Sequence, residues 1–217
     1  MNLQELSQLV SLGEGPSLEF KRKVPKPERI AKEVIAFANT RGGRLLLGVD
    51  DDGAITGVRD AEEEEFALHQ ALNTHCDPPV EFETERVQVT PKRDVILVSV
   101  PESAGKPHFL ITGENGSKPA AYVRVDDMSV EASRESVRIM REEKKNTDVL
   151  FEFGEKEQVL MRYLDSYGRI TVEQFATLVN ISKRSASQTL VILVRANILR
   201  LHSDARQDYF TLAYDVS

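Results

Sequence analysis

The sequence lacks a second cysteine, a long apolar run and a phosphate-binding glycine loop, and each absence excludes a class of protein. Cys76 is the one cysteine among 217 residues, so no disulfide forms within the chain and a reducing compartment is expected. No apolar stretch approaches the roughly 18 residues of a membrane-spanning helix, and Met1–Glu5 lacks the features of a signal peptide. We therefore expect a cytoplasmic protein that does not associate with membranes. The missing G-x-x-x-x-G-K-[ST] loop removes support for ATP binding.

Charge is unevenly distributed along the chain. The net charge is −7, and all of it lies in residues 1–150, which carry 20 Lys and Arg against 27 Asp and Glu. Residues 151–217 carry 8 of each and are neutral overall. This balance argues against indiscriminate coating of DNA but is compatible with a local basic face, a bound cation or a protein partner. A hydrophobic content of 41% is ordinary for a globular protein of one or two domains.

The pattern of residues 1–146 predicts an α+β domain with a mixed sheet and flanking helices. Alternating residues predict a half-buried strand over Ser17–Lys23, and a continuous apolar run predicts a buried strand over Leu45–Val49. A helix is expected between them, beginning near Pro27 and ending at Gly42-Gly43. Further strands are expected at residues 54–58, 80–89, 95–100, 109–111 and 121–125, and further helices at residues 2–12, 62–75 and 129–144.

A second, smaller domain is expected over residues 147–217. The charged, turn-prone run Glu142–Asn146 is the best candidate for the linker before it. A helix over Glu155–Tyr167 is followed by a helix capped by Thr171 and by a third helix capped by Ser182. Two short strands between residues 198 and 212 then form a hairpin. This order of elements is typical of a winged helix-turn-helix.

The third of these helices is the one that would enter the major groove of DNA through its N-terminal turns. The exposed residues there, which can contact phosphates or base edges, are Lys183, Arg184, Ser185, Ser187 and Gln188. The hairpin residues available for flanking phosphates are Arg200, His202 and Arg206. Winged helices also serve as protein-interaction modules, and the neutral charge of this region keeps that alternative open.

Three carboxylates of the first domain are candidates for a metal site. Glu19 and Lys21 project from the same face of one strand, and Glu14 precedes that strand across a Gly-Pro turn. Asp51 follows a buried strand. Carboxylates brought together from these places would repel one another unless a cation such as Mg²⁺ or Mn²⁺ lay between them. Such an ion can activate water at a phosphodiester, with Lys21 stabilising the developing charge. The alternative is that Asp50–Gly53 is an ordinary turn and the carboxylates are ordinary surface residues.

Three motifs occur in order in the first domain. They are Glu14–Lys21 (EGPSLEFK), Ala36–Gly43 (AFANTRGG) and Leu47–Gly53 (LGVDDDG), followed later by the strand Tyr122–Val125. Together they resemble the Schlafen AlbA-type domain, over roughly residues 10–145. The resemblance implies a DNA-binding domain of bacterial regulators, which is frequently followed by a helix-turn-helix.

The same resemblance implies a second possibility. In the animal Schlafen relatives a similar domain is an endoribonuclease that cleaves structured RNA such as tRNA. Its carboxylate triad aligns with Glu14, Glu19 and Asp51, and its companion lysine aligns with Lys21. The animal nucleases carry two lobes, whereas this sequence has one copy of the domain.

These observations favour a nucleic-acid-binding protein, a DNA-binding transcriptional regulator that forms a homodimer. Its partners would be duplex DNA or structured RNA. The first alternative is a metal-dependent endoribonuclease that uses the helix-turn-helix for docking. The second alternative is a protein-interaction adaptor.

Overall fold

The chain folds into two compact units. The computed structural model describes residues 1–112, 118–143 and 153–214. The first unit is Met1–Glu131 and the second is Ala132–Ser217. No helix in the described segments is long and apolar enough to cross a membrane.

The boundary between the units precedes helix α4 (Arg134–Glu143) instead of following residue 146. Helix α4 belongs to the second unit because it packs against helix α7 (Lys183–Arg195). Of the expected linker, residues 144–146 lie outside the described residues.

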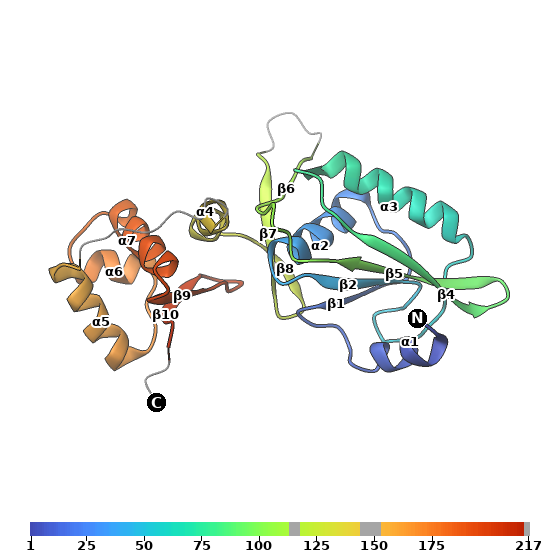
Figure 1. Cartoon of the computed structure of the whole chain (residues 1–217), viewed down its shortest axis with the longest axis horizontal. Coiled ribbons are helices and arrows are strands. Elements are labelled where there is room, and N and C mark those ends of the chain that lie inside the picture. Colours follow the sequence, from blue (N-terminus) through green and yellow to red (C-terminus); the bar gives the residue numbers. More distant parts are fainter. Residues whose placement is uncertain (113–117, 144–152, 215–217) are drawn as a thin grey trace. The chain divides into compact units, whose positions relative to one another are not determined.

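The first unit is built on a four-stranded sheet with the order β1-β2-β5-β4 (Figure 1). Its strands are β1 (Leu18–Lys21), β2 (Gly43–Leu47), β4 (Glu83–Thr90) and β5 (Arg93–Val100). Strand β1 runs parallel to β2, and the other neighbours are antiparallel. The prediction of an α+β fold with a mixed sheet is therefore confirmed, and β1 is an edge strand.

Helices cover both faces of this sheet because its buried strands carry apolar side chains on both sides. Helix α1 (Leu3–Val10) packs on one face, in a cluster that includes Leu46 and Leu97. Helices α2 (Pro27–Asn39) and α3 (Ala61–His75) pack on the other face, in a cluster that includes Leu45 and Val98. Figure 1 shows α1 and α3 on opposite sides of the sheet. Because α1 has only 8 residues, it leaves one end of its face uncovered.

A second sheet of the first unit has the order β3-β6-β7-β8. Its strands are β3 (Cys76–Asp77), β6 (Phe109–Leu110), β7 (Ala120–Val125) and β8 (Met128–Glu131). The buried Asn39 at the end of α2 joins this sheet to the helix layer. Its amide nitrogen donates to the carbonyls of His108 (2.9 Å) and Tyr122 (3.0 Å), and its amide oxygen accepts from the His108 N–H (2.8 Å).

Two elements differ from the expectation. Residues 54–58 form isolated bridges, Val49 with Ile55 and Val58 with Asp94, instead of a strand, and Gly57 interrupts them at a φ of 65°. The helix expected to begin at Ser129 begins at Arg134, because Ser129 belongs to β8. The helix is instead capped by Ser133, whose hydroxyl accepts from the Ser136 N–H at 3.1 Å.

The second unit contains four helices and a two-stranded hairpin in its described residues. After α4 come α5 (Glu155–Tyr167), α6 (Val172–Leu178), α7, β9 (Leu199–His202) and β10 (Tyr209–Leu212). Thr171 and Ser182 cap α6 and α7 through their hydroxyls, as predicted. The connection between α6 and α7 places Asn180 at a φ of 54°, which asparagine tolerates better than most residues. One apolar core, including Leu160, Phe175, Leu190 and Phe210, holds the helices to the hairpin.

Candidate nucleic-acid interface

Glu14 lies against the free edge of β1. Its carboxylate accepts a hydrogen bond from the Phe20 N–H at 2.9 Å. The Lys21 ammonium donates to the Phe20 carbonyl at 2.8 Å. Both outward-facing backbone groups of Phe20 are therefore satisfied by side chains. Edge strands need such protection because their unpaired groups are a template for aggregation.

Glu19 is a nearly buried carboxylate that is paired with two cations. Only 7% of the residue is exposed. Its carboxylate forms a short ion pair with Lys21 and lies 3.1 Å from the guanidinium of Arg124. Burial raises the pKa of Glu19 above its usual value, and the hydrogen bond from Lys21 opposes that rise. The two cations therefore offset much of the cost of holding the carboxylate away from water.

Arg124 on β7 is the residue that organises this region. Its side chain is fully buried and lies over the ring of Phe37 at 4.8 Å. One guanidinium nitrogen bonds Glu33 at 2.9 Å, and another bonds the Gly15 carbonyl at 2.8 Å. Arg124 thus connects β7 to α2, to β1 and to the loop that carries Glu14. The motif pattern assigned no role to Arg124 or Glu33. The one available signal was a charged residue inside an otherwise apolar strand.

Asp51 lies in an exposed turn, where Gly53 N–H donates to the Asp50 carbonyl at 2.8 Å. Its neighbour Asp50 lies 3.7 Å from Arg22. Within the described residues, no group of three or more His, Cys, Asp or Glu side chains is arranged to hold a metal ion. Glu19 instead faces Lys21 and Arg124. The residues present therefore do not fit the Mg²⁺ or Mn²⁺ site expected from Glu14, Glu19 and Asp51, because cations of the chain already neutralise the most buried carboxylate.

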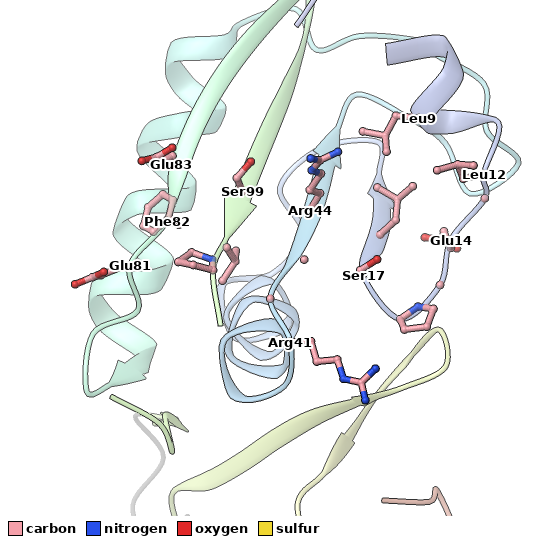
Figure 2. A pocket seen from close by; sticks show the side chains of 18 residues that line it. Leu9, Leu12, Glu14, Ser17, Arg41, Arg44, Glu81, Phe82, Glu83 and Ser99 are labelled. Atoms are coloured by element: carbon pink, nitrogen blue, oxygen red, sulfur yellow. The ribbon is translucent and has the colours of Figure 1, made fainter. Parts of the chain in front are cut away.

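A groove of about 890 Å³ opens where α1 leaves the sheet uncovered (Figure 2). A row of side chains crosses its floor in register from β1 to β4, made of Leu18, Arg44, Ser99 and Glu83. Leu9 of α1 and Leu12, just after that helix, line one wall, and Glu14 and Arg41 also line the groove. Among the described residues, neither Arg41 nor Arg44 has a side-chain hydrogen bond or an ion pair. The groove thus presents two arginines, three glutamates (Glu14, Glu81 and Glu83) and apolar walls.

The first turns of α7 display most of the polar residues expected to contact nucleic acid. Lys183, Arg184 and Gln188 are exposed. Lys183 pairs with Glu173 of α6 at 2.9 Å, and this hydrogen bond lowers the pKa of Glu173. Ser185 donates its N–H to the cap, Ser182, at 3.1 Å.

Ser187 differs from these residues because its hydroxyl donates to Glu135 of α4. Its side chain is therefore engaged within the second unit.

The hairpin adds cations and stacked rings. Arg200 and Arg206 are exposed, as expected for phosphate contacts. The ring of His202 stacks on that of Tyr209 at 4.9 Å with an angle of 6°. Arg169 lies over the Tyr209 ring at 5.4 Å, a cation that the sequence analysis missed. Burial, and next the charge of Arg200, lowers the pKa of His202, which favours the neutral form of the ring.

The first unit is an α+β domain with a capped edge strand and a buried arginine. Residues 14–133 match the family described as Schlafen, AlbA_2, so the chain is a member of the Schlafen AlbA_2 family. The match includes Glu14, Glu19, Lys21 and Arg124. The family assignment supports nucleic-acid binding. Among curated proteins, none matches the chain.

Two solved structures are similar to the chain. The DIP2311 protein from Corynebacterium diphtheriae is 22% identical over 62% of this chain, with a TM-score of 0.42, and the match spans 28% of that protein. The N-terminal domain of a RecG-related protein from Nitrosomonas europaea is 23% identical over 58% of this chain and 89% of that domain, with a TM-score of 0.42.

Proposed function

We propose that the protein is a DNA-binding regulator whose second unit is a winged helix-turn-helix. The observation that carries this proposal is the pair α6 and α7, joined by a tight turn, with exposed Lys183, Arg184 and Gln188 at the start of α7. The hairpin follows directly, as a wing does, and carries Arg200 and Arg206.

The chemistry of these residues suits duplex DNA. Lysine and arginine bind phosphate oxygens, and glutamine can bond the N6 and N7 edge of adenine in the major groove. The free N–H groups at the start of α7 favour a nearby phosphate, because a helix N-terminus carries partial positive charge. Such contacts position the helix, while the glutamine supplies base discrimination.

The first unit supports the proposal in two ways. It belongs to a family associated with nucleic acids, and its groove presents Arg41 and Arg44, whose side chains form no hydrogen bond or ion pair with the described residues. We also infer a homodimer, because a helix-turn-helix gains affinity by reading two half-sites.

The proposal is tested by fluorescence anisotropy with duplex DNA and with tRNA over a range of salt concentrations. The variant K183E/R184E should lose duplex binding, and its salt dependence should fall by about one slope unit for each lost phosphate contact. The matched control is K92E/R162E, which changes the net charge equally at two exposed positions outside α7. If K183E/R184E and K92E/R162E bind duplex DNA equally well, α7 is not the helix that contacts DNA. If the wild type binds tRNA more tightly than duplex DNA, the target is RNA.

A further inference from the structure

Helix α4 lies on the outward face of α7 (Figure 1). Ser187, Val191 and Arg195 are four residues apart and share one side of α7. The adjacent side carries the core residues Ala186 and Leu190. Val191 is nevertheless fully buried. The outward side is therefore covered by another part of the second unit, and α4 is the helix that packs there.

Side chains at both ends of α4 hold it on α7. Near its start, Glu135 accepts the hydroxyl hydrogen of Ser187. Near its end, Glu142 pairs with Arg195 at 3.1 Å. Between them Ile139 and Met140 are buried, with 7% and 6% exposure. Helix α4 thus runs alongside α7 for about two turns.

The start of α4 also touches the hairpin. The hydroxyl of Ser133 donates to Asp208 at 2.6 Å. The hydroxyl oxygens of Ser136 and Ser203 lie 3.2 Å apart. One short helix therefore contacts both parts of the second unit that a winged helix-turn-helix uses on DNA.

We propose that α4 is a displaceable cover over the DNA-reading surface, and that duplex DNA binds tightly only when α4 moves off α7. This inference rests on the proposed function of α7. A duplex that follows the outward face of α7 would meet α4 from Ser187 to Arg195, and it would meet α4 again at the hairpin. Lys183, Arg184 and Gln188 are exposed beside the covered side of α7, so they can make the first contacts with DNA before α4 leaves.

The cover reduces apparent affinity by the fraction of molecules that are open. The apparent dissociation constant equals the intrinsic constant divided by that fraction, so a protein that is open about one tenth of the time binds about tenfold more weakly. Locking α4 should abolish tight binding, and releasing it should tighten binding by about tenfold or more.

The lock is the variant S136C/S203C, in which two cysteines replace hydroxyls that already lie side by side. The native Cys76 does not interfere, because it is buried and burial raises its pKa to about 12. Oxidised full-length protein, with the crosslink verified by mass, should bind duplex DNA at least tenfold more weakly than the same protein after reduction.

The release is the variant E135A/E142A, which removes both carboxylate anchors. Its matched control is E155A/D165A, which removes the same charge at two exposed positions on α5. Release should tighten duplex binding by about tenfold relative to the control, because the control reproduces the general gain from removing two negative charges.

The experiments distinguish two outcomes: that α4 does not act as a cover, and that the proposed DNA-binding function is wrong. Oxidised S136C/S203C that binds as tightly as reduced protein would overturn the cover, as would cysteines that do not crosslink. E135A/E142A that binds no better than E155A/D165A would also overturn it. If no variant binds duplex DNA, including E135A/E142A, the proposed function is wrong and the cover has no role.

Discussion

Arg124 brings two carboxylates, Glu19 and Glu33, into the interior of the first unit. Removing a charge from water costs several kcal/mol, and a pair recovers that cost only when its geometry and hydrogen bonds are good. Here the guanidinium has both carboxylates, a carbonyl and a hydroxyl as partners. Loss of the arginine would therefore leave Glu33 without a cation and Glu19 with Lys21 as its remaining cation among the described residues.

We expect R124M to lower the free energy of unfolding by about 3–5 kcal/mol, the usual cost of breaking a buried pair. The measurement is urea denaturation followed by circular dichroism. The matched control is R86M, which removes an arginine paired with Glu65 at 2.6 Å on the surface, and its loss should be much smaller. Equal losses in the two variants would show that the buried network contributes no more than a surface pair.

The free energy of unfolding that R124M loses relative to the wild type should increase as the pH rises. The pKa of Glu19 is already raised by burial, and removal of Arg124 raises it further. A carboxyl whose pKa is higher in the folded state stabilises the protein below its unfolded pKa, and this contribution is lost as pH rises through the folded pKa. The difference between wild type and R124M should therefore be larger at pH 7 than at pH 5.

The neighbours of Glu19 also predict how the protein responds to divalent ions. Because Lys21 and Arg124 neutralise Glu19, millimolar Mn²⁺ should leave the melting temperature of the wild type unchanged. An ion bound only by the folded state would add about 2.7 kcal/mol at a hundredfold excess over its dissociation constant. If Mn²⁺ raises the melting temperature of the wild type and E19Q abolishes that rise, the metal site expected from the sequence is supported. The ribonuclease alternative would then be supported as well.

At the scale of elements, local patterns predicted most of what the structure contains. The apolar run Leu45–Val49 predicted a buried strand, and Ser182 predicted the start of α7, because periodicity and caps act within a few residues. The predicted start of α4 was wrong. Ser129 and Ser133 are both plausible N-caps, and Ser129 is assigned to a strand by its pairing with β7, which no local pattern shows. The roles of Arg124 and Glu33 depend on contacts 91 residues apart, which no local pattern contains.

The turn between α6 and α7 determines the orientation of α7 relative to α6. Asn180 occupies the left-handed region at a φ of 54°. A β-branched side chain there is strained, so N180V should destabilise the second unit by about 1–2 kcal/mol. N180G should be neutral, because glycine adopts this conformation without strain. Thermal unfolding measures both, and equal melting temperatures for N180V and N180G would show that the turn tolerates another conformation.

At the scale of the whole molecule, the chain divides into two compact units after Glu131, whereas the sequence analysis placed a domain boundary after residue 146. The difference comes from α4, which the sequence analysis predicted as the last helix of the first domain, before a linker at Glu142–Asn146, whereas it packs against α7 of the second unit. Sequence composition detects polarity, whereas domain membership depends on what an amphipathic helix packs against.

The chain should be a homodimer in solution. Closed two-fold dimers are the commonest soluble assembly, and a dimeric helix-turn-helix reads half-sites about one helical turn apart. Exposed apolar side chains on the first unit, Leu12 at 76% and Phe66 at 70%, are available for association. Light scattering at micromolar concentration should give twice the 24.4 kDa of one chain. Duplexes with two half-sites should then bind more tightly than duplexes with one, with a preference for spacings near one helical turn. A mass of 24.4 kDa, together with equal affinity for single and paired half-sites, would instead describe a monomer that contacts DNA through one copy of α7.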